Sequence, residues 1–286
     1  MRKFLIKNEY GETLELQGNS FFLYQPDGWG YADNIEYMEA DGFFIETFRA
    51  PLQVEKTGTL VFKPNEAYRN FQEFANWIFS AQTLTLGYKP INTWYYVDVD
   101  LIRMDKGELN VAGLLEIPVV FAPKSPLYAT TTLNVQIEQS DASKAKKYGY
   151  KYGYRYAASI KAGAIQFTVG AQIPGDFSIT IPGAISAPVI VARRMDTNAV
   201  IGKVDLSAIS IPAGETLFFS TVPKEAGAKT VSGLTTTDVT EYIGLDPQYK
   251  TFFKLPPNVP IEFVLEADTL DGVHASIKAY RYFRTV

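Results

Sequence analysis

The sequence of 286 residues contains no cysteine and only one histidine, His274. Without cysteine there can be no disulfide, no thiolate nucleophile and no thiolate metal site, so stability has to come from packing or from oligomerisation. His274 lies in a segment whose apolar residues alternate, and we expect it on the polar face of a strand. With no second histidine, neither metal ligation nor general-base catalysis is predicted there.

Long apolar runs are also missing. Lys7 and Glu9 interrupt the N-terminal segment too early for a signal peptide, and no run approaches the roughly 18 residues of a membrane span. We therefore expect a protein that is made and kept soluble, without membrane insertion. Excess positive charge is lacking too: the formal net charge is −4, and residues 1–128 alone carry 11 basic and 17 acidic side chains. This balance argues against nucleic-acid binding, which needs a concentrated basic surface.

Aromatic residues, by contrast, are abundant, with 19 Phe, 18 Tyr and 3 Trp. Such side chains fit the half-buried surfaces of sheets and large interfaces. The hydrophobic fraction of 47% and the charged fraction of 20% are typical of a folded globular protein. The length indicates two domains, although one very large β-sandwich is also compatible with it.

The first part of the chain is predicted to be a β-sandwich-like domain with one α-helix. Apolar runs at residues 4–6 and 14–16 indicate a hairpin, and alternation over 94–104 indicates a strand that returns over 109–121 after a turn at 105–107. Between them, Asn65 can cap a helix with apolar side chains at three- and four-residue steps. The residues on that apolar stripe are Ala67, Phe71, Phe74, Ala75 and Ile78.

A stretch with two prolines, residues 121–128, can continue neither a helix nor a central strand, so we place the domain boundary there. The predicted domains are 1–128 and 129–286. Short strands separated by Gly/Pro turns follow, which indicates a C-terminal antiparallel β-sandwich or jelly roll. The predicted fold class is therefore mainly β.

Two aromatic features are candidate contact sites. The turn Pro26–Gly30 should carry Trp29 exposed at its tip. Farther on, five tyrosines alternate with glycine and basic residues and would share one face of a strand. Such a face can pack against a neighbouring sheet or subunit, or it can stack on a sugar. These tyrosines are Tyr148, Tyr150, Tyr152, Tyr154 and Tyr156.

Carboxylates offer the remaining candidate chemistry. Asp98 and Asp100 point to the same face of a predicted strand, where a pair of acids could hydrolyse a glycosidic bond, although hydrated surface is the default for such pairs. A second acidic cluster could ligate Ca²⁺, but its spacing matches no defined ligand series. Phosphate-binding loops and a Gly-x-Ser-x-Gly elbow are absent from the sequence, so we predict no enzyme and no cofactor. The second cluster consists of Glu36, Glu39, Asp41 and Glu46.

Several motifs follow one another along the chain in a characteristic order. They are the N-terminal hairpin, the helix with Tyr68, Phe71, Phe74 and Trp77, the strand Glu116–Phe121 with Ser125–Tyr128, and in the second half Ile181–Gly183, Pro188, Ile201–Gly202, Gly214–Leu217 and Phe253–Asn258. This order resembles that of a known family, the distal tail proteins of long-tailed siphophages. The family's first domain ends in a strand followed by a Phe, a few residues and Ser-Pro-Trp-Tyr, and here Leu127 replaces the Trp.

The resemblance implies a structural protein of the virion tail tip, made in the host cytoplasm. It implies a ring, usually a hexamer, that the N-terminal domains build between the tail tube and the tail-tip protein. The C-terminal domains, galectin-like or like a carbohydrate-binding module, would point outward. No catalytic residues come with it. Two alternatives stay open: a glycan-binding module that contacts the host cell wall through the C-terminal domain, and, as the weakest, a polysaccharide hydrolase.

Overall fold

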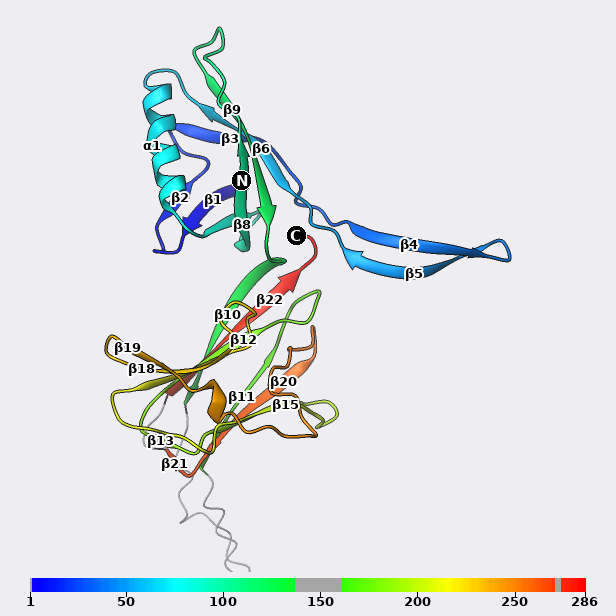
Figure 1. Ribbon diagram of the computed structural model, residues 1–286, viewed down its shortest axis with the longest axis vertical. Helices are drawn as coiled ribbons and strands as arrows, with labels where there is room; N and C mark the ends of the chain where they lie inside the picture. Colours follow the sequence, from blue (N-terminus) through cyan, green and yellow to red (C-terminus); the bar gives the residue numbers. More distant parts are fainter. Residues whose placement is uncertain (1, 137–160, 271–273) are drawn as a thin grey trace, which may run out of the picture. The chain divides into compact units, whose positions relative to one another are not determined.

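The computed structural model describes residues 2–136, 161–270 and 274–286. The chain divides into two compact units, one formed by Met1–Ala129 with Tyr282–Val286 and the other by Thr130–Arg281 (Figure 1). The chain therefore passes between the units twice, within strand β10 (Leu127–Gln136) and within strand β22 (His274–Phe283). The return of the last residues to the first unit is a feature that the sequence did not indicate.

The first unit is built from antiparallel strands in the order β2-β1-β7-β8-β9-β6-β3. Alternating apolar residues of these strands, among them Phe4, Ile6, Leu60 and Phe62, point into one buried core. A separate pair, β4 with β5, is described below. The bounds are β1 Lys3–Asn8, β2 Thr13–Glu15, β3 Phe21–Asp27, β4 Asp33–Ala40, β5 Phe43–Pro51, β6 Lys56–Phe62, β7 Leu84–Lys89, β8 Tyr95–Met104 and β9 Leu115–Pro123.

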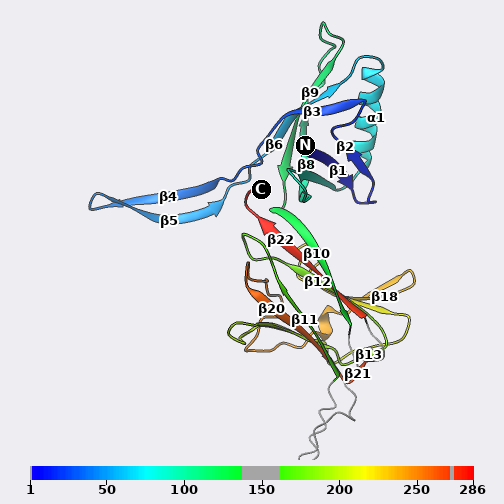
Figure 2. The same ribbon diagram turned by 180° about the vertical axis from the view of Figure 1, so that it is seen from behind.

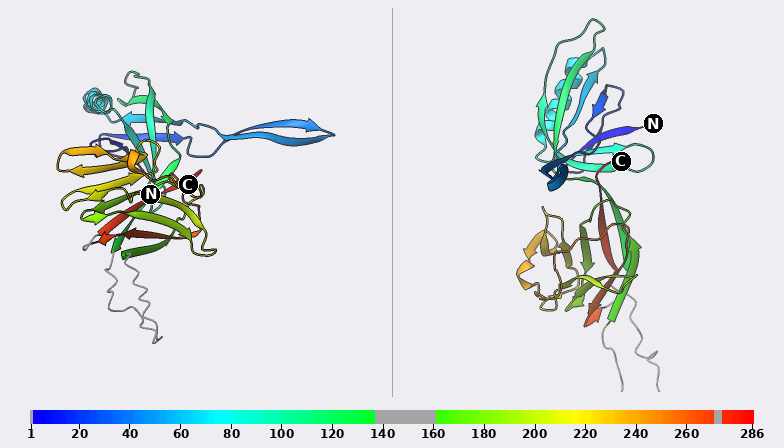
Figure 3. Two further views of the ribbon diagram at one scale, coloured as in Figure 1. Left: turned by 60° about the horizontal axis from the view of Figure 1, so that its bottom comes forward. Right: turned by 90° about the vertical axis from the view of Figure 1, so that its right-hand side faces the viewer.

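The predicted helix is confirmed as α1, Ala67–Ser80, which lies along one side of the strands of the first unit (Figure 3). Its buried Phe74 packs edge-on against Phe21 and Phe62, at ring-centroid distances of 5.4 and 6.0 Å. The predicted cap is wrong: the N-cap is Glu66, not Asn65, and its side chain makes no capping hydrogen bond. Both residues have a positive φ, whereas a capping side chain needs the extended conformation. No helix of the described residues is long and apolar enough to cross a membrane.

The predicted hairpin over 94–121 forms as β8 and β9, but its second strand begins at Leu115 instead of residue 109. The intervening residues form a longer loop because the side chain of Asn110 organises it. Its Oδ1 atom accepts hydrogen bonds from the backbone amides of Ala112 and Leu114, at 2.9 and 3.1 Å. Hydrogen bonds between a side chain and the nearby backbone compete with those between two strands. The second strand therefore begins only at Leu115.

The second unit is a mainly β structure with two larger antiparallel sheets. One has the order β19-β18-β17-β12-β22-β10, the other β11-β20-β14-β15, and a small sheet has the order β16-β13-β21. The bounds are β11 Lys161–Thr168, β12 Phe177–Pro182, β13 Ile185–Ser186, β14 Val189–Arg194, β15 Val200–Asp205, β16 Ser210–Ile211, β17 Thr216–Ser220, β18 Gly227–Ser232, β19 Thr235–Asp238, the 3₁₀ turn η2 Thr240–Tyr242, β20 Pro260–Ala267 and β21 Thr269–Leu270. The mainly β fold predicted from the sequence is thereby confirmed.

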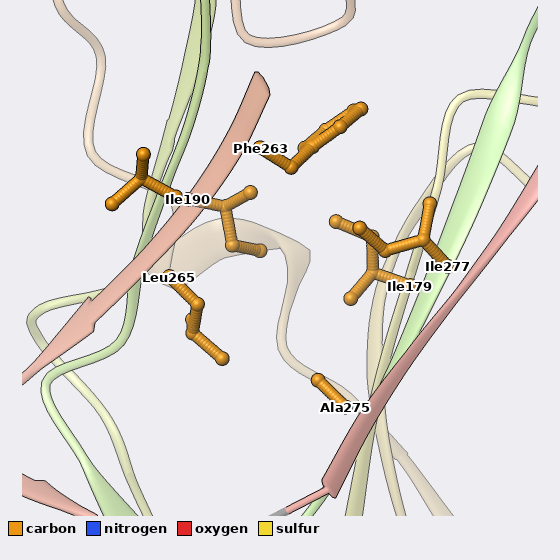
Figure 4. Close-up of a pocket in the computed structure, with 7 residues that line it drawn as sticks. Ile179, Ile190, Phe263, Leu265, Ala275 and Ile277 are labelled. Atoms are coloured by element: carbon orange, nitrogen blue, oxygen red, sulfur yellow. The ribbon is translucent and has the colours of Figure 1, made fainter. Parts of the chain in front are cut away.

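The two larger sheets of the second unit bury one apolar core between them. Phe177 lies at its centre, with its ring 4.8 Å from that of Phe253 and 5.1 Å from that of Phe263. A cavity of about 10 Å³ remains where side chains of β12 and β22 face those of β14 and β20 (Figure 4). Its lining is apolar, so a water molecule there would find no hydrogen-bond partners. The cavity is therefore a packing defect and not a ligand site.

Candidate assembly interface

The strands β4 and β5 form a two-stranded hairpin that stands clear of the other strands of the first unit (Figures 1 and 2). We call residues 33–51 the arm. Its turn is the pair Asp41-Gly42, with φ angles of 51° and 79°. Positive φ at both positions is the signature of a type I′ turn, for which Asp-Gly is a preferred sequence. The turn chemistry thus fixes the arm as a tight hairpin.

Apolar side chains predominate on one face of the arm, above all in the half that ends in the turn. The register pairs Met38 with Ile45 and Ala40 with Phe43, and a bulge near Glu36 brings Phe48 onto the same face. Phe43 at the end of this face is 74% exposed, which leaves nearly the whole ring in water. The apolar side chains of this face, which we call the apolar face of the arm, are Met38, Ala40, Phe43, Ile45, Phe48 and Ala50. Toward the base, Glu36 and Asn34 share the face, opposite Phe48 and Ala50.

Such a structure is incomplete by itself. A two-stranded hairpin is marginally stable in water, and a contiguous exposed apolar surface marks a site of association. No other strand of the described residues pairs with the outer edge of β4 or β5, so both edges offer backbone groups for pairing. The arm therefore has the physical character of a segment that docks on another surface.

The opposite face of the arm mixes aromatic and charged residues. Glu46 forms two hydrogen bonds with Arg49, at 2.9 and 2.6 Å, and these hold the pKa of its carboxyl below its usual value. Glu39 on this face, Glu36 on the apolar face and Asp41 in the turn form no ion pair with any residue that the structure describes. With five acidic residues and one basic residue, the arm has a net charge of −4.

The base of the arm is held by a cluster of four side chains. The Asp33 side chain is only 4% exposed, and its Oδ2 atom lies 2.9 Å from Nη1 of Arg49 and 3.8 Å from Nη1 of Arg284. The Arg284 guanidinium also donates to the hydroxyl of Tyr31 and lies 4.8 Å from the centre of that ring. The Tyr31 hydroxyl and the two guanidinium groups lower the pKa of Asp33. The C-terminal segment thus anchors the strands of the arm.

The structure corrects the expectation of an exposed Trp29. The ring is half-buried and packs 5.4 Å from Phe4 and 4.6 Å from Tyr88, measured between ring centroids. The buried ammonium of Lys56 lies 5.7 Å from the indole ring and donates to the carbonyl of Gly28. Burial lowers the pKa of Lys56. Trp29 closes this end of the core because its large ring fills the space beside Phe4, so it is not a projecting contact residue.

The other predicted site residues fall outside the arm. The tyrosines at 148, 150, 152, 154 and 156 lie outside the described residues, so their role as a packing or sugar-stacking face stays a prediction. His274 is exposed at the start of β22, as expected for the polar face of a strand. Within the described ranges, no group of three or more His, Asp or Glu side chains could hold a metal ion.

Asp98 and Asp100 are engaged in structural contacts. The Oδ1 atom of Asp98 accepts hydrogen bonds of 3.1 Å from the hydroxyls of Thr85 and Tyr128. Asp100 pairs with the ammonium of Lys124 at 2.5 Å. Both carboxylates tie β8 to neighbouring segments of the first unit.

The sequence interpretation had considered the acids of residues 36–46 only as a possible calcium site and had missed the hairpin. Two signals were present: apolar residues on both sides of Asp41-Gly42, and the Asp-Gly pair itself. The side chains missed in this way are Met38, Phe43, Phe44, Ile45 and Phe48, together with Arg49 and Arg284 at the base.

Comparison with known proteins relates the first unit to a protein family. Residues 3–124 match the family model described as the distal tail protein, N-terminal domain. This unit is a distal tail protein domain. The family resemblance seen in the sequence is thereby confirmed for this part of the chain.

Solved structures extend the likeness beyond this domain. A chain in the phage P2 baseplate, in its activated conformation with calcium, is similar with a TM-score of 0.67 at 16% identity, and the match covers 100% of both chains. The distal tail protein of phage SPP1, described as a paradigm of the hub adsorption apparatus in phages that infect Gram-positive bacteria, is similar with a TM-score of 0.59 at 12% identity over 97% of this chain and 98% of that one. At these identities the likeness is one of fold. No curated protein matches the chain in sequence.

Proposed function

We propose that copies of this distal tail protein assemble into a closed ring, most simply a hexamer, and that the arm of each copy binds the next one. The observation that carries the proposal is the apolar face of the arm, which lies exposed on a hairpin that is marginal without a partner. In this contact, the arm of one copy binds a surface of the next copy that is not itself the arm. Such a head-to-tail contact generates a ring when its rotation closes.

In this proposal the ring lies between the tail tube and the tail-tip protein. The family of the first unit and the likeness in fold to a phage baseplate chain support this place. The role is one of joining and not of catalysis, which agrees with the structural contacts of Asp98 and Asp100. Burial of aromatic side chains at such a contact is the usual source of binding energy in protein interfaces.

The proposal is tested on the double variant Phe43→Ser/Ile45→Ser, with the double variant Leu234→Ser/Leu245→Ser as the control. Both pairs are exposed apolar residues, but the control pair lies in loops of the second unit. Gel filtration with light scattering and negative-stain microscopy should show rings for the wild-type protein and the control, and monomers for the arm variant at an unchanged unfolding temperature. A wild-type protein that stays monomeric at every concentration, or an arm variant that still forms rings, would overturn the proposal.

A further inference from the structure

Three aromatic side chains of the first unit lie outside its core. They are Trp94, just before β8, Tyr96 in β8 and Tyr128 in β10, and we call them the aromatic row. Because Val97 of β8 is buried in the core, its neighbour Tyr96 points to the outer face of the sheet, where Tyr128 is its direct partner. The ring centroids of Trp94 and Tyr96 lie 6.3 Å apart, and those of Tyr96 and Tyr128 lie 6.0 Å apart. The three rings therefore form one continuous aromatic surface.

Neighbouring side chains hold the aromatic row in place. Gly87 of β7 is the partner of Tyr96, and a Cβ atom at Gly87 would lie only 3.3 Å from Cε1 of that ring, so the ring lies over the bare backbone of the glycine. The hydroxyl of Tyr128 donates to Oδ1 of Asp98 at 3.1 Å, and the hydroxyl of Thr85 donates to the same oxygen. The rings thus need little ordering when a ligand arrives, which lowers the entropic cost of binding.

The same face carries ammonium groups without a carboxylate partner. Lys3 at the start of β1 and Lys89 at the end of β7 are direct partners across the two strands, and Lys89 lies on the face of Gly87. Within the described ranges, no carboxylate forms an ion pair with either lysine. The Nζ atom of Lys89 lies 5.9 Å from the centre of the Trp94 ring, so its charge lies at one end of the aromatic row. Like charges opposite one another destabilise a sheet, and an anion bound between them removes that repulsion.

A sugar ring with an acidic group has the complementary chemistry. The C–H bonds on one side of a pyranose form an apolar patch that stacks on the negative face of an aromatic ring. A carboxylate on the sugar forms charge-assisted hydrogen bonds with ammonium groups. A polyanion without rings would leave the aromatic row unused, and a neutral sugar would leave the charges of Lys3 and Lys89 opposed.

We infer that this outer face of the first unit binds an acidic polysaccharide. One sugar ring stacks on Trp94, and its carboxylate lies against Lys89 and Lys3. Asn92 and Thr93, which are exposed in the loop between β7 and β8, form hydrogen bonds with the hydroxyls of the same sugar. The inference goes beyond the proposed ring and uses no residue of the arm, so either can fail without the other.

Saturation-transfer difference NMR on the full-length protein tests the inference, because it measures weak binding of a small ligand to a large assembly. A hyaluronan hexasaccharide supplies both rings and carboxylates, chitohexaose supplies rings alone, and inorganic polyphosphate serves as a competitor with charge alone. The hyaluronan hexasaccharide is expected to bind at least about 10-fold more tightly than chitohexaose. The C–H protons on one side of the sugar should receive most of the saturation, and polyphosphate should displace the sugar only in large excess.

Variants of the two parts of the site carry the test further. Trp94→Ala should weaken binding of the hyaluronan hexasaccharide by about 10-fold or more, and Lys89→Gln by roughly 5- to 10-fold, since each removes one part of the contact. Trp94→Phe keeps an aromatic ring and should retain most of the affinity. The controls Phe79→Ala and Lys63→Gln remove an exposed ring from α1 and a single ammonium group after β6, and both should bind as the wild type does. Thermal unfolding of each variant shows that the fold is kept.

Three results would each overturn the inference. The first is a wild-type protein that does not bind the hexasaccharide. The second is unchanged binding by Trp94→Ala together with displacement by polyphosphate at equal charge, because the face would then attract any polyanion. The third is tight binding of chitohexaose that Lys89→Gln does not weaken, because the site would then be one for neutral sugars. The variant Phe43→Ser/Ile45→Ser, which tests the ring, should bind the hexasaccharide as the wild type does, so the two proposals are measured separately.

Discussion

Asp33 and Arg49 join the two strands of the arm at its base, with 2.9 Å between Oδ2 of the acid and Nη1 of the guanidinium. The Asp33 side chain is shielded from water, and Arg284 from the C-terminal segment approaches the same oxygen. The two strands of the arm and the distant C-terminal segment thus share one carboxylate, and its charge holds the arm in place.

Replacing Asp33 with Asn should lower the unfolding temperature of the protein at neutral pH, because the two guanidinium groups lose their anionic partner. The pKa of Asp33 is lowered in the folded protein, mainly by the hydroxyl of Tyr31 and then by Arg49. A lowered pKa contributes stability above the unfolded value of about 4 and loses it as the pH falls through the folded value. The measurement is calorimetry of the wild-type protein and the variant between pH 7 and about pH 2.

We expect the difference in unfolding temperature between the two proteins to be largest at roughly pH 5–7, above the unfolded pKa of Asp33. The difference should shrink as the pH falls toward about 2. Glu12→Gln is the control, because that exposed acid lies in the turn between β1 and β2, away from the arm. A gap that stayed constant over the whole range would show that the charge of Asp33 is not what stabilises the base of the arm.

Gly202 is predicted to tolerate no larger residue. A Cβ atom there would lie 2.1 Å from Cδ1 of Phe253 and 2.6 Å from the carbonyl oxygen of Lys250. Gly202→Ala must therefore displace Phe253, which is packed against Phe177, and we expect a loss of about 1–3 kcal/mol in the stability of the second unit. Gly170→Ala, where a Cβ meets nothing within 4 Å, should change it by less than about 0.5 kcal/mol. Urea unfolding curves of the two variants give both values, and equal losses would contradict the packing argument.

Phe74 and Phe79 lie on the same helix but should respond differently to truncation. Phe74 is buried against Phe21 and Phe62, whereas Phe79 is 70% exposed. Phe74→Ala removes core contacts and leaves a cavity, so it should cost about 3–5 kcal/mol, whereas Phe79→Ala should cost less than about 0.5 kcal/mol. Chemical denaturation followed by far-UV circular dichroism measures both; a large loss for Phe79→Ala would mean that its ring is covered.

Ile277 is one of the residues that line the small cavity in the second unit, and we predict how its truncation changes the stability of that unit. Ile277→Ala joins a new void to an existing one, so we expect a loss in the upper part of the usual range of about 2–5 kcal/mol. Ile277→Val, which removes a single methylene group, should cost about 1 kcal/mol. Thermal unfolding resolves the two cases, and similar losses for both would show that the site collapses around the smaller side chain.

Local patterns in the sequence were enough to predict several elements. The helix followed from the three- and four-residue spacing of Ala67, Phe71, Phe74 and Ile78, and the exposure of His274 followed from strand alternation. These are short-range properties, since each depends on the residues of a single element. The order of turn and strand motifs along the chain likewise sufficed for the family resemblance, which the match of residues 3–124 confirmed.

The tertiary structure alone decided which side chains meet. Trp29 stands in a sequence that is typical of an exposed turn, yet Phe4 and Tyr88 from two other strands cover its ring. Arg284 lies 251 positions after Asp33, and no spacing rule connects them. The apolar residues of the arm have the pattern of a core strand, and only the tertiary structure shows them to be exposed, because no other strand of the described ranges pairs with β4 or β5. Periodicity determines which residues share a face of an element; what covers that face depends on contacts between distant segments, which the chain makes only when it folds.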